Sequence, residues 1–362
     1  MNCINMDNNR IPFCSSRNYS VETGCWEIIV IVLFLFIPTN KIQAQINFVD
    51  SSVTQDEINQ YSFLVGGHYY GNSINSTGLP ANTVLANLDL FNADLYRFHV
   101  ALGDVFLDVR NDFPLYRNKF FDKIHTPFHI AVGNHDVSGS FFEDYIGKTS
   151  LQFRFGSDAH VILDTEKNDG SIIGKQLALL KRACNSDCQN IFIYSHRPVW
   201  SEEDTEMIGI FKDNTSSTFG VNFKEDILPL IKSVDDSVNV FWMSGSLGGS
   251  APASYFYCKR KNLHFIQTAI RGKKRDGVLQ VSVDNGNVSF KPISLTGQNL
   301  NSLESYNLAF WRAEHPKEEF NSRLIKLYLV NMASHRYFWY GIMFTSFLGI
   351  IGFIFFRRRL EK

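Results

Sequence analysis

The chain has 362 residues, of which 44% are hydrophobic and 14% aromatic, so it is long enough to bury a substantial core in one large domain or two small ones. Its 35 Lys and Arg residues nearly balance its 36 Asp and Glu residues, which gives a formal net charge of −1 at pH 7. This balance offers no broad basic surface, and we therefore expect no nucleic-acid partner.

The N-terminal region has the pattern of an export signal. Ile28–Pro38 (IIVIVLFLFIP) is apolar but shorter than the about 20 residues that a transmembrane helix needs. Polar residues and then Ala44 and Gln45 follow it, as at a processing point. The polar stretch before it is long, which fits either a start codon placed too far upstream or a cytoplasmic tail. We predict that residues 1–45 form a leader with a signal peptide.

Residues 46–295 alternate between short apolar runs and segments of helical periodicity, which predicts an α/β domain. The predicted strands are Tyr61–Val65, Tyr96–Leu102, Phe128–Val132, His160–Leu163, Ile191–Tyr194 and Val238–Met243. The predicted helices are Asn82–Leu90, Leu115–Ile124 after Pro114, Gly174–Cys184 and Lys224–Ile231. Consecutive strands are expected over Leu263–Pro292, with a hairpin turn at Asp284–Asn287.

The C-terminal region has the pattern of a membrane anchor. Residues 296–336 are expected to form a juxtamembrane stalk that contains a helix over His315–Met332. Tyr337–Phe356 carries no charge, has the length to span a bilayer and opens with aromatic residues. Arg357–Arg359 follow it, so the positive-inside rule places the tail, residues 357–362, in the cytoplasm. We predict a single-pass membrane protein whose globular domain lies on the extracytoplasmic side, with the lipid bilayer as a partner.

Three cysteines follow the predicted leader. Cys184 and Cys188 are close enough in the sequence to form a disulfide in an oxidising compartment, which would leave Cys258 alone. The same spacing also arises by chance on helices. A metal site here is not expected, because no His and no second Cys pair accompany them.

Polar side chains with metal-binding chemistry follow four of the predicted strands. They are His68 in VGGHYYG, Asp104 in ALGDVFLD, Asn134, His135 and Asp136 in AVGNHDV, and His196 in IYSHRPVW. Any one of these is most simply a turn or a polar cap. Four in succession indicate a shared site, because functional groups of α/β sheets gather at the carboxyl ends of strands. Carboxylate, amide and imidazole together suit a divalent cation.

These motifs resemble those of a known family. Gly103-Asp104, then Gly133-Asn134-His135-Asp136, then His196 before Arg197-Pro198 resemble the calcineurin-like metallophosphoesterases, specifically the secreted acid-phosphatase type. The resemblance covers roughly residues 61–292. It implies a sandwich of two mixed β-sheets flanked by helices, and phosphoester hydrolysis assisted by two divalent metals.

The resemblance also implies roles for single residues. Asp104 would bridge two metals, His68 would bind the first, and Asn134 and His196 would bind the second. His135 would face the substrate as the general acid, with Asp136 orienting its ring. Arg197 could attract the substrate anion near this site.

Three expected metal ligands are absent. Gly66 stands where the family has an Asp, and Ser246 and Gly248 stand where it has two His residues. His264 is a weak substitute, since it lies within the next apolar run, HFIQTAI. We therefore expect at most one divalent ion (Mn, Fe or Zn), with the Ser246 hydroxyl as a poor further ligand, and not a full dinuclear centre.

Two functions remain open on the sequence. The first is a membrane-anchored metallophosphoesterase whose activity is weak or altered because its dinuclear site is incomplete. The second is a catalytically inactive pseudoenzyme that acts as a binding or scaffold protein at the cell envelope and recognises a phosphorylated or anionic ligand. Arg271–Arg275 (RGKKR) could attract such an anion, but we interpret this segment as a solvated loop.

Overall fold

The computed structural model describes residues 58–201, 204–211, 222–313 and 336–360, together with the isolated helical positions 325, 329, 332 and 333. The predicted signal segment Ile28–Pro38 and most of the predicted stalk helix His315–Met332 lie outside these residues.

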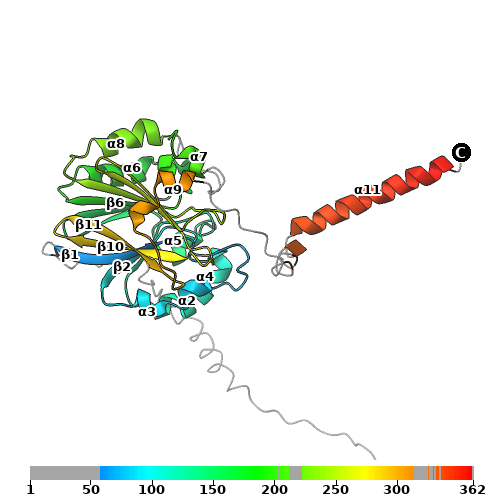
Figure 1. Cartoon of the computed structure of the whole chain (residues 1–362), viewed down its shortest axis with the longest axis horizontal. Helices are drawn as coiled ribbons and strands as arrows, with labels where there is room; N and C mark the ends of the chain where they lie inside the picture. Colours follow the sequence, from blue (N-terminus) through cyan, green and yellow to red (C-terminus); the bar gives the residue numbers. More distant parts are fainter. Residues whose placement is uncertain are drawn as a thin grey trace, which may run out of the picture. The chain divides into compact units, whose positions relative to one another are not determined.

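Two mixed β-sheets form the centre of the globular part (Figure 1). The first sheet has the order β11-β10-β1-β2-β3, made of Asn287–Ser294, Gly277–Asp284, Gln60–Gly66, Tyr96–Ala101 and Phe128–Ile130. The second has the order β4-β5-β6-β7-β9-β8, made of Leu151–Phe155, Asp158–Ile162, Asn190–Ser195, Asn239–Ser244, Leu263–Thr268 and Tyr255–Arg260. All six strands predicted one by one are present, and the consecutive strands expected over Leu263–Pro292 are β9, β10 and β11.

The parallel strands are neighbours in each sheet; they reach the β3 edge of the first sheet and occupy the middle of the second. In the first sheet β1, β2 and β3 are parallel, and in the second β5, β6, β7 and β9 are parallel. The antiparallel strands β11, β4 and β8 lie at the edges. Since parallel strands end on the same side of a sheet, the loops that follow β1, β2, β3, β6, β7 and β9 gather at common edges.

Three apolar layers hold this arrangement together. The layer between the sheets joins side chains of both, and the Phe63 and Phe192 rings meet edge to face with centroids 5.4 Å apart. A second layer packs one sheet against α6 (Gly174–Cys184), α8 (Leu228–Lys232) and α9 (Leu308–Arg312), and a third packs the other against α2 (Asn82–Leu85), α3 (Leu88–Phe91) and α4 (Val109–Lys119) (Figure 1). The predicted sandwich flanked by helices is confirmed.

The start of α4 differs from the sequence prediction. The helix begins at Val109, because the Asp108 carboxylate caps it by accepting hydrogen bonds from the amides of Arg110 and Asn111. Pro114, which we took as the helix start, lies inside the helix. The predicted hairpin turn is confirmed, since Asn285 and Gly286 both have positive φ between β10 and β11.

Cys184, Cys188 and Cys258 are free thiols in the structure, so the Cys184–Cys188 disulfide is not formed. Burial, reinforced by the neighbouring Cys188, raises the pKa of the Cys184 thiol to about 12. Both thiols are therefore protonated at neutral pH, a form that reacts slowly with oxidants.

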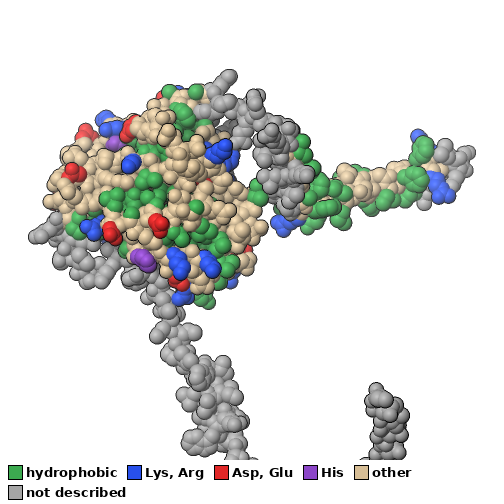
Figure 2. All heavy atoms as spheres, turned by 60° about the horizontal axis from the view of Figure 1, so that its bottom comes forward, with side chains coloured by type: hydrophobic (Ala, Val, Ile, Leu, Met, Phe, Trp, Pro, Cys, Tyr) green, Lys and Arg blue, Asp and Glu red, His purple; other side chains and the backbone are tan. Residues whose placement is uncertain are grey.

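The C-terminal helix α11, Arg336–Leu360, covers the predicted membrane span and extends to the arginines that follow it. Its stretch Arg336–Ile354 has a mean hydropathy of 1.6, and none of it is buried within the chain. Figure 2 shows hydrophobic side chains along this helix and basic side chains at its end. The helix is compatible with a single-pass membrane anchor.

Candidate metal centre

Main-chain hydrogen bonds fasten the loops at the carboxyl ends of the parallel strands to one another. The His68 amide donates to Gly103 O (3.0 Å), which joins the loops after β1 and β2. The Gly245 amide donates to His196 O (2.9 Å), which joins those after β7 and β6. The Ile270 amide donates to Gly67 O (2.8 Å), which brings the loop after β9 to the same place. Loops of both sheets thus form one rigid platform.

Two glycines allow this close approach. Gly103 has a φ of +82°, and a Cβ there would lie 2.5 Å from His196 Nδ1. A Cβ on Gly133 would lie 2.3 Å from Asp104 Oδ1. The glycines of the GD and GNHD motifs therefore make room for the site residues themselves.

His68, Asp104 and His196 form a buried group of metal-ligating side chains, whose ligand atoms all lie within 4.8 Å of one another. Asp104 Oδ2 lies 3.3 Å from His68 Nδ1 and 3.5 Å from His196 Nε2. His68 and Asp104 also have positive φ, at 54° and 52°, a strained conformation that is concentrated at functional sites.

The hydrogen bonding of His196 fits a cation. Its Nδ1 donates to Leu102 O (2.8 Å), so the neutral ring carries a lone pair on Nε2. This Nε2 is buried, has no hydrogen-bond partner within the described part of the chain, and faces the Asp104 carboxylate. A ligand histidine whose other nitrogen bonds a main-chain carbonyl is the usual arrangement at a metal. The donors of the three residues suit one Zn, Mn or Fe ion.

The electrostatics favour the metal-binding protonation states. Burial lowers the pKa of His68 well below its usual range, although the adjacent Asp104 opposes this shift. Burial raises the pKa of Asp104, but His196 and His68 outweigh this effect and leave the pKa below its ordinary value. At neutral pH, His68 is therefore neutral and Asp104 is ionised.

His135 and Asp136 lie beside this group, but they do not interact in the way that we expected. His135 Nδ1 lies 2.8 Å from Leu107 O, and the His135 amide donates to Asp104 Oδ1 (3.2 Å). The buried Asp136 carboxylate instead accepts hydrogen bonds from the amides of Phe106 (3.0 Å) and Gly133 (2.9 Å). Asp136 therefore links the loops after β2 and β3. The Leu107 carbonyl, and not Asp136, orients the His135 ring.

Burial raises the pKa of Asp136 well above its usual range, and the negative charge of Asp104 adds to this effect. Asn134, expected as a ligand of the second metal, is exposed in the loop after β3.

No family model and no curated protein matches the chain. Among solved structures, it is similar to a dimetal phosphatase from Danio rerio (12% identity, 65% of this chain, 96% of that chain, TM-score 0.42). It is also similar to a purple acid phosphatase from yellow lupin seeds, Lupinus luteus (11% identity, 67% of this chain, 53% of that chain, TM-score 0.44). A third similar structure is Vacuolar Protein Sorting 29 from Cryptosporidium parvum (10% identity, 66% of this chain, 100% of that chain, TM-score 0.29). These TM-scores are below 0.5, so any conclusion about chemistry rests on the site.

In its two mixed sheets and its motifs, the chain resembles the calcineurin-like metallophosphoesterases. Two of the three positions where ligands are missing, Gly66 and Ser246, are closely packed in the structure. A Cβ on Gly66 would lie 3.1 Å from Val278 Cγ1 and 3.3 Å from the Tyr69 hydroxyl, within an apolar layer. Ser246 is buried, and its amide donates to His196 O (2.8 Å).

His264 does not compensate for these losses. It lies on β9, where its Nδ1 is 2.9 Å from the Tyr257 hydroxyl, and it stacks on Phe241. Its exclusion from the predicted site is confirmed.

Arg271, which the sequence analysis assigned to a solvated loop, enters the centre. Its Nη1 lies 2.8 Å from His68 Nδ1 and 3.3 Å from His68 Nε2. Lys273 Nζ donates to Gly249 O (2.6 Å), and Arg275 donates to Gly249 O (3.1 Å) and Ala253 O (2.6 Å). The interpretation as a solvated loop was therefore wrong for these three side chains, although Lys274 is exposed. The signal that could have found Arg271 is its position directly after a strand, which it shares with the other site residues.

Arg197, predicted to bind the substrate anion, is already engaged. Its Nε and Nη2 each donate to the Glu166 carboxylate at 2.7 Å. The side chains are 7% and 8% exposed, so this is a buried bidentate ion pair. Arg197 follows His196 in sequence, but its charge is neutralised by Glu166, and the anion-binding role does not fit it.

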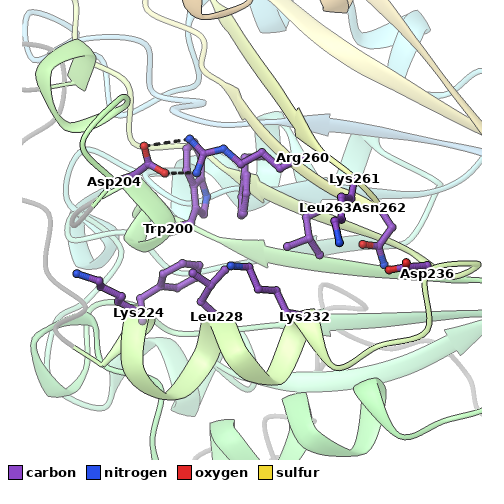
Figure 3. Close-up of a pocket in the computed structure, with 12 residues that line it drawn as sticks. Trp200, Asp204, Lys224, Leu228, Lys232, Asp236, Arg260, Lys261, Asn262 and Leu263 are labelled. Atoms are coloured by element: carbon purple, nitrogen blue, oxygen red, sulfur yellow. Dashed lines mark hydrogen bonds and ion pairs between the residues drawn. The ribbon is translucent and has the colours of Figure 1, made fainter.

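A separate cavity of about 590 Å³ lies near the first residue of β9, whereas the metal centre lies beyond the end of that strand (Figure 3). Its wall is mainly apolar, and Arg260 at its margin is paired with Asp204. None of the predicted site residues lines it; the lining comprises Trp200, Asp204, Phe223, Lys224, Leu228, Lys232, Asp236, Arg260, Lys261, Asn262, Leu263 and Phe265.

Proposed function

We propose that the chain is a membrane-anchored, extracytoplasmic metallophosphoesterase-like protein that hydrolyses phosphoesters weakly with a single divalent ion. The observation that carries this proposal is His196 Nε2, a buried nitrogen without a hydrogen-bond partner in the described residues that lies 3.5 Å from the Asp104 carboxylate. Two lone-pair donors facing each other in a buried site are stabilised by a cation between them.

Asp104 and His196 would hold this ion, with His68 as the third donor of the buried group. Asn134, exposed in the loop that carries His135, stays the predicted further ligand. Bound there, a divalent ion would supply Lewis-acid activation of water and of the phosphoryl group. The bond to Leu107 O fixes His135 through its Nδ1–H. With a second proton on Nε2, the imidazolium ring would deliver that proton to the leaving oxygen. Asp136 keeps the loops that carry Asp104 and His135 in register.

Weak activity follows from the missing ligands. A single ion lacks the second positive charge that neutralises the transferring phosphoryl oxygens, an effect worth several kcal/mol at comparable sites. Since each 1.4 kcal/mol corresponds to about tenfold in rate, the chain would be several orders of magnitude slower than an enzyme with two metals.

The alternative is a catalytically inactive binding or scaffold protein at the cell envelope. The position of Arg271 favours it, because a guanidinium 2.8 Å from His68 Nδ1 occupies a nitrogen that a metal would need. The absence of ligands at Gly66, Ser246 and Gly248 favours it as well.

The membrane topology is part of the proposal. Helix α11 would span the bilayer, and Arg357 and Arg359 at its end favour a cytoplasmic C-terminus. The globular domain would then lie on the extracytoplasmic side. An epitope tag at the C-terminus should resist added protease in intact cells and become sensitive after the membrane is permeabilised; digestion of the tag in intact cells would contradict this topology.

Metal content and hydrolysis test the activity. The full chain, purified in detergent and incubated with Mn, should hold about one metal per chain and hydrolyse an aryl phosphate or phosphodiester. Asp104→Ala should lose both properties. His264→Ala removes a histidine of β9 that lies outside the centre, and this variant should retain both the metal and the hydrolysis. A wild-type chain without bound metal, or with the same turnover as Asp104→Ala, would exclude the enzyme and leave the binding protein.

A further inference from the structure

We infer that Arg271 forms an oxyanion-binding position beside the metal centre, where its guanidinium replaces a second metal ion in binding the phosphoryl oxygens of a phosphoester. This inference rests on the proposed function, because it concerns the same site and the same class of ligand.

The guanidinium lies on the face of the centre that the missing ligands would have occupied. Its Nη1 is 2.8 Å from His68 Nδ1, and His68 in turn is 3.3 Å from Asp104. The Tyr70 ring packs beside His68 and His135, with centroids 5.4 and 5.1 Å away. On another side, a Cβ on Gly249 would lie 3.6 Å from Arg271 Nη2. Gly249, which follows the position Gly248 where the family has a histidine, thus leaves room for the arginine.

Among the described residues, no carboxylate is seen to pair with the Arg271 guanidinium, whereas Arg197 pairs with Glu166 and Arg260 with Asp204 and Glu206. Arg271 instead contacts the His68 imidazole, and its Nε is buried without a hydrogen-bond partner among the residues that the structure describes. A partly buried cation without a counter-ion is completed by an anion, and a planar guanidinium matches the oxygens of a phosphate.

The backbone holds Arg271 in place. Its amide donates to Asp276 Oδ1 (2.9 Å), and its carbonyl accepts a hydrogen bond from Asn72 Nδ2 (3.1 Å). Asp276 is itself fully buried and accepts a hydrogen bond from the Thr83 hydroxyl (2.8 Å). A donor fixed in this way needs no reorganisation when a ligand arrives, which is the condition under which a charge stabilises a phosphoryl group most effectively.

A guanidinium can neutralise charge but cannot activate water. In the inferred arrangement Asp104 and His196 would hold an ion that would supply this activation, and Arg271 would bind the phosphoryl oxygens. His135 lies beside this site, since its amide contacts Asp104 and its ring packs against Tyr70.

The test measures the affinity for inorganic phosphate by calorimetry, with the Mn-loaded full chain in detergent. Arg271→Met should weaken binding roughly ten- to a hundredfold, the usual value of a hydrogen bond to a charged group. Arg271→Lys should recover part of the loss, because lysine keeps the charge but not the planar fork. Lys274→Met is the matched control, since Lys274 is exposed in the same loop, and it should change the affinity less than twofold.

Metal content, measured on the same samples, separates this inference from the proposed function. One metal per chain in the wild type and in Arg271→Met, with phosphate binding weakened in the variant alone, supports the inference. Unchanged phosphate affinity in Arg271→Met, or two metals per wild-type chain, overturns it. A wild-type chain that holds no metal but binds phosphate through Arg271 would refute the proposed hydrolysis and leave the anion position standing.

Discussion

Replacing Gly103 by Ala should both destabilise the protein and disrupt the metal centre. Gly103 has a φ of +82°, and an added Cβ would lie 2.5 Å from Nδ1 and 2.7 Å from Cγ of the fully buried His196. The left-handed backbone costs Ala about 1–2 kcal/mol, and forcing a methyl group into a filled space costs about 1–3 kcal/mol. Displacing His196 also breaks its bond to Leu102 O, for about 0.5–1.5 kcal/mol more. We expect a loss of about 3–6 kcal/mol in the free energy of unfolding.

Gly297 provides a matched control for this prediction. Its φ is +76°, but an added Cβ would meet no atom within 4 Å, so Gly297→Ala should cost the backbone strain alone, about 1–2 kcal/mol. Urea denaturation of the full chain in detergent, followed by tryptophan fluorescence, measures both variants, and metal analysis shows whether His196 has moved. If Gly103→Ala is no less stable than Gly297→Ala, or if it retains the full metal content, the tight packing of His196 against this loop is refuted.

Three further predictions concern buried charges and imidazoles. Arg197→Met should destabilise the protein by about 3–5 kcal/mol, because it leaves Glu166 buried without its partner. The phosphate affinity of this variant, measured by calorimetry, should be unchanged. A tenfold loss of affinity would show that Arg197 binds the anion after all. Burial lowers the pKa of His99, His129 and His264 to about 4. The unfolded chain therefore binds more protons between pH 6.5 and 4, and stability should fall with decreasing pH in this window by up to about 1.4 kcal/mol per pH unit for each histidine; a flat profile in urea titrations would contradict this. His129→Leu should stabilise the chain by about 1–3 kcal/mol and reduce that slope by one proton, since neither ring nitrogen has a hydrogen-bond partner among the described residues; destabilisation on denaturation would show that a partner had been missed.

The sequence predicted the central strands well, because strands buried on both faces appear as continuous apolar runs. The edge strands β4 and β8 were missed because they lack such a continuous apolar run. In β4 (LQFRF), four of the five residues are only partly buried or exposed, and their mixed pattern gives no continuous run. Helix α4 was predicted to start too late because Pro114 was weighted above the capping residue Asp108.

The sequence predicted which residue types form the candidate site, but it did not predict which arginine side chain points toward the centre. His68, Asp104 and His196 come together as expected, since strand ends converge in this class of fold. Arg197 and Arg271 both follow strands, and a sequence does not show which of them turns toward the centre. The Arg197 guanidinium pairs with the Glu166 carboxylate, whereas Asp276 and Asn72 bind the backbone of Arg271. The contacts with Glu166 and Asn72 join residues 31 and 199 positions apart, and local sequence patterns do not reveal such contacts.

The surroundings of Gly66 limit how the site could be re-engineered or could change in evolution. A side chain at this position would point toward Val278 and the fully buried Tyr69, whose hydroxyl has no hydrogen-bond partner among the described residues. An aspartate introduced here alone would place a carboxylate in an apolar layer, while Arg271 would still occupy His68. An aspartate at Gly66 would therefore restore the first metal position only together with a change at Arg271, which makes the two positions interdependent.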